Sequence, residues 1–99
     1  MKHAGEAALD TIEPLLAELR RMEGLRERNR GVFYRNSSAF IHFHEDPAGI
    51  FADLRANSGW TRVPVNSPSE HRRLIRAARE ILSRTTRPGA GIGEQRPSR

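Results

Sequence analysis

Two histidines separated by one residue are the strongest candidates for chemistry in this chain. His42 and His44 lie in a stretch that alternates apolar and polar residues, so a strand would turn both imidazoles to one face with their Cα atoms roughly 7 Å apart. That spacing suits two ligands of one zinc or iron(II) ion, and Asp46 or Asp53 would complete a two-histidine, one-carboxylate site. His-x-His also recurs without metals, and in that case Asp53 and Arg55 partner the histidines from the next strand. A divalent metal is the only cofactor that these residues indicate.

The same histidines could also transfer protons. Either imidazole would act as a base oriented by Asp53, with the second partner drawn from Ser37, Ser38 or Tyr34. The connections between the predicted strands are short, and a chain of 99 residues offers little depth from which to exclude water. The sequence therefore favours a role in binding over catalysis.

The histidines belong to a larger predicted face. Strand alternation assigns Ile41, Phe43, Ala52, Leu54, Val63 and Val65 to a core face, provided that no bulge shifts the register. The opposite face then carries an aromatic and charged set: Tyr34, Phe40, His42, His44, Phe51, Asp53, Arg55, Trp60 and Arg62. Large exposed apolar patches mark interaction sites. We therefore expect a non-enzymatic binding module whose open sheet face meets a protein partner or a second copy of the chain, and a homodimer is the simplest form.

Four strands must position this face. Short runs rich in aromatic and β-branched residues, separated by turn residues, predict strands over 31–35, 39–44, 50–55 and 60–65. The separators are short enough for hairpins, so the strands should form an antiparallel meander.

Two helices flank the strands. Apolar residues from Leu9 to Met22 recur with helical spacing, and Pro14 is tolerated there if the helix begins at Asp10 or Thr11. Ser67-Pro68-Ser69-Glu70 predicts the start of a second helix, with Ser67 as the N-cap, Pro68 at the first position and Glu70 closing a capping box. The order α-β-β-β-β-α predicts an α+β two-layer sandwich with both helices on one face of the sheet.

The length of 99 residues limits the chain to a single domain. We expect a flexible N-terminus over 1–8, one α+β domain over 9–82 and a disordered basic tail over 83–99, which is rich in Gly, Pro, Ser and Arg. Cysteine is absent, so disulfides, thiolate zinc sites and cysteine nucleophiles are excluded. No stretch has the composition of a signal peptide or of a membrane span, and we expect a cytoplasmic protein with no membrane partner.

Nucleic acid is an alternative partner. The chain has 16 Arg and one Lys, with clusters over 20–35 and 72–79 and further arginines in the tail. The predicted domain is only +2, because 12 Arg face 10 acids, whereas the tail is +3. Nucleic-acid binding through the arginine clusters and the tail therefore stays open beside the interaction module.

The segments GVFYR, AFIHFHEDPAG, FADLR and RVPV resemble a set of short bacterial proteins that share this hairpin arrangement and a closing helix. That resemblance implies a self-contained domain over about residues 19–82 and carries over no catalytic residue.

More loosely, two helices flanking one antiparallel meander resemble the frataxin-like architecture, which also occurs in small bacterial proteins described as DNA-binding. Frataxins carry an acidic ridge for iron on the first helix and the neighbouring strand. The matching region here holds Arg20, Arg21, Arg26 and Arg28 among its acids, so the likeness does not extend to iron handling.

Overall fold

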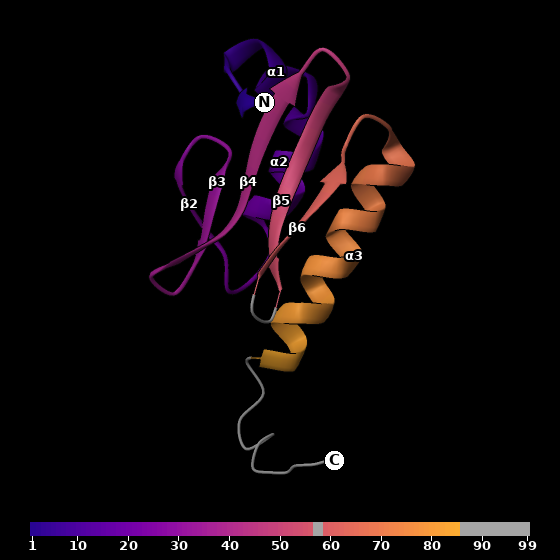
Figure 1. The fold of residues 1–99 in the computed structure, drawn as a ribbon. Coiled ribbons are helices and arrows are strands. Elements are labelled where there is room, and N and C mark those ends of the chain that lie inside the picture. Colours follow the sequence, from indigo (N-terminus) through magenta and orange to yellow (C-terminus); the bar gives the residue numbers. More distant parts are fainter. Residues whose placement is uncertain (57–58, 86–99) are drawn as a thin grey trace.

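The computed structural model describes residues 1–56 and 59–85 of the chain (Figure 1). All strand pairings in these residues are antiparallel, and together with the helices they confirm an α+β protein. The elements follow in the order β1 (Lys2–His3), α1 (Glu6–Thr11), α2 (Glu13–Arg20), β2 (Arg26–Asn29), β3 (Val32–Arg35), β4 (Ser38–Asp46), β5 (Gly49–Ala56), β6 (Gly59–Pro64) and α3 (Pro68–Thr85).

The predicted meander is present, since the sheet order is β2-β3-β4-β5-β6 with sequential neighbours paired. Two strands were not predicted. β2 consists of charged and polar residues with low strand preference, and it forms an edge of the sheet. β1 pairs with β4 off this path, with His3 opposite His44. The prediction of a flexible segment over 1–8 is thus corrected, because these residues add a strand to the sheet and begin α1 at Glu6.

The predicted first helix is divided at Ile12 into α1 and α2, and Pro14 lies in the first turn of α2, where a missing N–H is tolerated. The start of α3 follows the prediction. The backbone N–H of Glu70 donates to Ser67 Oγ at 3.2 Å, while the Glu70 carboxylate reaches back to accept from the N–H of Asn66 at 2.7 Å. This capping box spans one residue more than predicted.

One hydrophobic core joins the helices to the sheet. Leu15, Leu16 and Leu19 of α2 are fully buried with Ile41 of β4 and Leu74 of α3. Figure 1 shows α2 behind the central strands and α3 along the β6 side. The opposite face of β4 and β5 is not covered by these helices and carries the histidines.

A β-bulge changes the predicted face. Phe33 pairs with Ile41 and Tyr34 pairs with Ala39, so Phe40 has no counterpart on β3. The extra residue shifts the side-chain alternation. Phe40 is 2% exposed and belongs to the core cluster. The prediction that Phe40 lies on the open binding face was therefore wrong, and the bulge is the reason.

The predicted tail begins inside α3, which continues to Thr85, and residues 86–99 lie outside the described part of the chain, as do residues 57–58 between β5 and β6. Within the described ranges, no helix combines the length and the apolar character needed to cross a membrane.

Candidate metal centre

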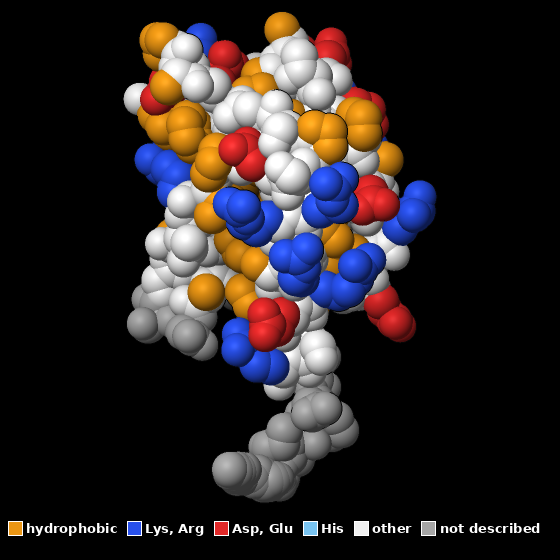
Figure 2. Space-filling view, turned by 90° about the vertical axis from the view of Figure 1, so that its right-hand side faces the viewer, with side chains coloured by type: hydrophobic (Ala, Val, Ile, Leu, Met, Phe, Trp, Pro, Cys, Tyr) orange, Lys and Arg blue, Asp and Glu red, His pale blue; other side chains and the backbone are white. Residues whose placement is uncertain are grey.

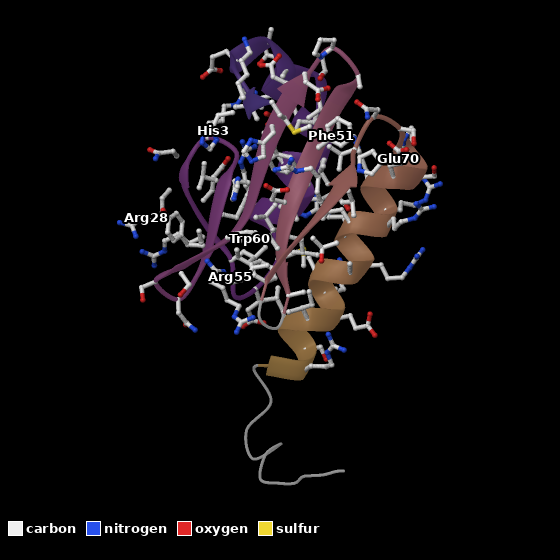
Figure 3. The ribbon with its side chains drawn as sticks, viewed as in Figure 1. His3, Arg28, Phe51, Arg55, Trp60 and Glu70 are labelled. Atoms are coloured by element: carbon white, nitrogen blue, oxygen red, sulfur yellow. The ribbon has the colours of Figure 1, made fainter. Side chains whose placement is uncertain are left out.

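Three histidines meet on the open face of the sheet. His42 and His44 lie two residues apart on β4, and His3 lies opposite His44 because β1 pairs there (Figure 3). One ligand nitrogen from each of the three rings lies within 4.8 Å of the other two. The centroid of the His44 ring lies 4.9 Å from the centroid of the His3 ring and 4.9 Å from that of the His42 ring. The strand register alone thus brings three imidazoles to one point.

Several ring nitrogens in this cluster are buried without a hydrogen-bond partner among the described residues. They are Nδ1 of His42 and both Nδ1 and Nε2 of His44. Buried polar atoms are normally satisfied, so such a group requires an explanation. Neutral imidazole nitrogens are good ligands for zinc and related ions, and a bound ion would supply the missing partner.

The buried carboxylate of Asp53 lies beside His42 and His44. Asp53 on β5 pairs with His42 in the strand register and is 6% exposed. Its two oxygens accept from Arg62 Nε at 2.7 Å and Nη2 at 2.9 Å. The Arg62 hydrogen bonds hold the pKa of Asp53 below its usual range against the opposing effect of burial. Asp53 therefore keeps a negative charge beside the imidazoles.

This carboxylate also faces one of the imidazoles. His44 Nε2 lies 3.0 Å from Asp53 Oδ2, a contact at ion-pair distance whose angle is outside that of a hydrogen bond. Carboxylates next to metal-binding histidines fix the orientation of the ring and raise its basicity. A small rotation of the His44 ring would align this contact.

The protonation of His42 also suits a ligand role. Burial lowers the pKa of His42, and the neighbouring His44 lowers it further, so that the neutral ring is favoured. A metal ion binds the neutral ring.

Trp60 and Arg55 lie along one side of the histidine cluster. The Trp60 ring on β6 lies edge-on to His42, with their centroids 4.7 Å apart. The Arg55 guanidinium lies over Trp60 at 4.4 Å from the ring centroid, and its Nε donates to the Ala39 carbonyl at 2.9 Å. Trp60 and Arg55 thus shield His42 on the β6 side while Trp60 itself stays 42% exposed.

The structure brings together most of the predicted site residues. His42, His44 and Asp53 are adjacent, Phe51 is half-buried opposite His44, and the remaining neighbours are Arg55, Trp60 and Arg62. Tyr34 lies apart on β3, where the Arg28 guanidinium covers its ring at 5.0 Å. Asp46 lies at the end of β4 and accepts a turn hydrogen bond from Ala48. The open face is thus less aromatic than predicted, and its role as a homodimer or partner interface stays a prediction.

Sequence reasoning missed His3. The residue lies in a segment assigned to a flexible N-terminus, and two residues are too short for a strand signal of their own. The third histidine at the start of a chain that carries His-x-His elsewhere was the one available hint.

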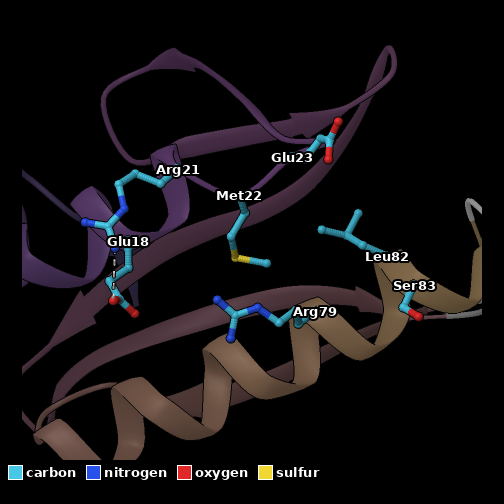
Figure 4. Close-up of a pocket in the computed structure, with 7 residues that line it drawn as sticks. All are labelled: Glu18, Arg21, Met22, Glu23, Arg79, Leu82 and Ser83. Atoms are coloured by element: carbon cyan, nitrogen blue, oxygen red, sulfur yellow. Dashed lines mark ion pairs between the residues drawn. The ribbon is translucent and has the colours of Figure 1, made fainter.

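A separate hollow of about 460 Å³ lies between α2 and α3 and shares no residue with the histidine cluster. Figure 4 shows Arg21 and Glu18 paired at its rim, with Arg79 below Met22. Its lining mixes both charges with few apolar side chains, so we assign no ligand to it.

Comparisons with protein-family models, with curated proteins and with solved structures found no match for this chain. The resemblances to short bacterial proteins and to the frataxin-like architecture stay predictions.

Proposed function

We propose that this protein binds one divalent transition-metal ion through His3, His42 and His44, with zinc as the ion that best suits the donors. The observation that carries the proposal is the meeting of three imidazoles whose ligand nitrogens lie within 4.8 Å of one another. Three imidazoles are a known zinc set that leaves a fourth tetrahedral position for water or another ligand. Nitrogen donors also disfavour magnesium and calcium, which prefer oxygen.

The spacing is open enough to admit the ion. Zn–N bonds of about 2.0–2.1 Å in a tetrahedron separate the ligand nitrogens by about 3.3 Å. The imidazoles would close by rotating about their side-chain bonds, and His3, the exposed member of the three, has the most freedom to do so. Binding would also give a partner to one ring nitrogen of His42 and one of His44.

The proposal describes a binding module, in agreement with the role favoured by the sequence. Asp53 would orient the His44 ring and offset part of the charge of the ion, while Arg62 keeps that carboxylate ionised. Trp60 would shield His42 from solvent. The fourth position, facing away from the sheet, is where water or a donor from a partner would bind.

Zinc titration by calorimetry, with cobalt(II) as a visible probe of tetrahedral coordination, tests the proposal. The chain offers a matched control, because its fourth histidine, His71, lies on α3 outside the cluster. We expect one equivalent of zinc to bind, and His3→Ala, His42→Ala and His44→Ala each to weaken binding at least tenfold. His71→Ala should retain the affinity of the parent.

Zinc should also stabilise the fold. At a free zinc concentration of 100 times Kd, linkage adds about 2.7 kcal/mol to the free energy of unfolding. Absence of binding to the parent, or equal weakening in His71→Ala and the three cluster variants, would contradict the proposed centre.

A further inference from the structure

Two groups of arginines in this chain differ in their ion pairing, a difference that only the structure reveals. One group is engaged inside the fold. Arg20 pairs with Glu13 and Glu27, and Arg30 pairs with Glu6, Asp10 and Glu13. These contacts tie the β2–β3 hairpin to α1 and α2. Together with Arg21, which pairs with Glu18, they engage three of the six arginines of the predicted 20–35 cluster.

The second group lies on α3. This helix carries five arginines, and none of them forms an ion pair with any residue in the part of the chain that the structure describes: Arg72, Arg73, Arg76, Arg79 and Arg84. Only two acids lie on the same helix, and the Glu70 carboxylate is occupied by the capping contact with Asn66. Five arginines against Glu70 and Glu80 leave α3 with a net charge of +3.

The fold turns this charge outward. Leu74, Ile75 and Ala78 are buried against the core, which directs Arg72, Arg73 and Arg76 to solvent. Figure 2 shows several Lys and Arg side chains on the face of the molecule that includes α3, with acidic side chains beside and between some of them. An 18-residue helix is about 27 Å long, and four residues advance about 6 Å along its axis. At 3.6 residues per turn, Arg72, Arg76 and Arg79 fall within about 60° of one another around the helix, while Arg73 and Arg84 lie on the adjoining surface beside Glu80.

The chemistry of the α3 arginines favours phosphate groups as their partners. Guanidinium groups bind phosphate oxygens with two parallel hydrogen bonds. They are more weakly hydrated than an ammonium group, so removing their water costs less free energy. An α-helix with its side chains is about 10–12 Å wide, and the major groove of duplex DNA is about 12 Å wide. The exposed basic face of α3 is therefore opposite in charge to the phosphates that border a groove, and the helix is similar in width to the major groove.

Other polyanionic partners fit the face less well. A helix that binds a lipid surface buries an apolar face in the membrane, but the apolar face of α3 is already packed against the sheet. Protein interfaces centre on apolar or aromatic anchors. Among the described residues the exposed large hydrophobic side chains are Met1 and Trp60, and neither belongs to α3.

We infer that the outer face of α3 is a docking surface for duplex nucleic acid, which it binds through the phosphate backbone by means of Arg72, Arg73 and Arg76, with Arg79 and Arg84 nearer the C-terminal end of the helix. The inference is independent of the proposed metal centre, because α3 contributes no residue to the histidine cluster.

A pair of charge-matched triple variants tests the inference in the full chain. Arg72, Arg73 and Arg76 are changed to Gln in one variant. In the control, Arg21, Arg26 and Arg28 are changed to Gln, which removes the same charge from exposed positions outside α3. Binding to a 20-base-pair DNA duplex is followed by fluorescence anisotropy at several salt concentrations.

We expect the α3 variant to bind at least tenfold more weakly than the parent and its salt slope to fall by about 2.7, since each lost phosphate contact removes about 0.9 from the slope. The control should change affinity by less than about threefold, as expected for charge acting at a distance. Circular dichroism would verify that both variants are folded.

Equal losses of duplex affinity in the two variants would overturn the inference, because net charge alone would then account for the binding. No loss in the α3 variant would overturn it as well, by assigning duplex binding to another part of the chain. Tighter, α3-dependent binding to vesicles containing phosphatidylserine, or to poly-glutamate, would overturn the choice of nucleic acid as the partner.

Discussion

Changing Asp53 to Asn tests how the open face is held together. The side chain of Asp53 is 8% exposed, and its carboxylate accepts two hydrogen bonds from Arg62, one at 2.7 Å and one at 2.9 Å. Asn keeps the shape but loses the charge and one of the two acceptors. Hydrogen bonds to charged groups contribute about 1.5–3 kcal/mol, and the 48% exposure of the Arg62 side chain reduces this through solvent screening. We expect a loss of about 1.5–2.5 kcal/mol in the free energy of unfolding.

For a domain of this size that loss corresponds to a decrease in Tm of about 6–20 °C. Urea unfolding followed by circular dichroism measures the stability, and zinc calorimetry on the same samples measures the site. Loss of a carboxylate that orients a metal-binding histidine typically weakens metal affinity by about 10–100-fold. Asp53→Asn should therefore lower both stability and zinc affinity.

Arg62→Gln separates the two effects. It leaves the buried Asp53 carboxylate without its cation, so the stability loss should equal or exceed that of Asp53→Asn. Asp53 keeps its carboxylate beside His44 in this variant, so zinc affinity should fall less than in Asp53→Asn. If both variants lose zinc affinity equally, Asp53 acts only by supporting the fold. If Asp53→Asn loses no stability, the described contacts contribute nothing measurable and the reasoning fails.

Three further predictions concern the rest of the fold. Phe40→Ala should cost about 3–5 kcal/mol because the bulge buries that ring, whereas Phe51→Ala on the open face should cost clearly less; equal losses in urea unfolding would refute the assigned bulge. Burial acts to raise the pKa of Glu27, but hydrogen bonds from Arg20 and the Gly31 N–H outweigh it and hold the pKa below its usual range. The stability that Glu27 adds is therefore present at neutral pH and is lost as acid protonates it, so Glu27→Gln should flatten the decline of Tm below about pH 4.5, and an unchanged acid profile would contradict this. Gly31→Ala should cost about 1–3 kcal/mol in urea unfolding, since φ is +81° and a Cβ would lie 2.8 Å from a side-chain carbon of α1, and an unaltered midpoint would exclude that clash.

The elements with strong local signals were predictable. β3 to β6 follow runs of aromatic and β-branched residues, and α3 begins where Ser67 and Pro68 place its cap. Alternation along β4 and β5 also correctly joined His42, His44 and Asp53 on one face. These features depend on neighbouring residues in the sequence or on a single hairpin register.

The remaining features, apart from the bulge at Phe40, depend on contacts between distant segments. β2 is a strand because Glu27 pairs with Arg20 of α2 and lies opposite Phe33, although its own residues favour exposure. The bulge at Phe40 had a sequence signal, since three apolar residues in a row, 39–41, break the alternation of a strand. His3 joins the cluster through a pairing across about forty residues, which no local pattern reports.

The short strand β1 has a consequence for how a third ligand is supplied. β1 is held by its register with β4, by the Ala4 N–H to the Phe43 carbonyl at 3.1 Å and by the Gly5 N–H to Glu45 Oε2 at 2.7 Å. It also covers part of an edge of β4 that could otherwise accept a foreign strand. The short tether to α1 keeps His3 at a high effective concentration near the other two imidazoles. If β1 instead paired with β4 of a neighbouring molecule, each metal centre would combine His3 of one copy with His42 and His44 of another. One ion would still bind per chain, and because both forms would offer the same three ligands, the metal alone would not favour the exchanged dimer.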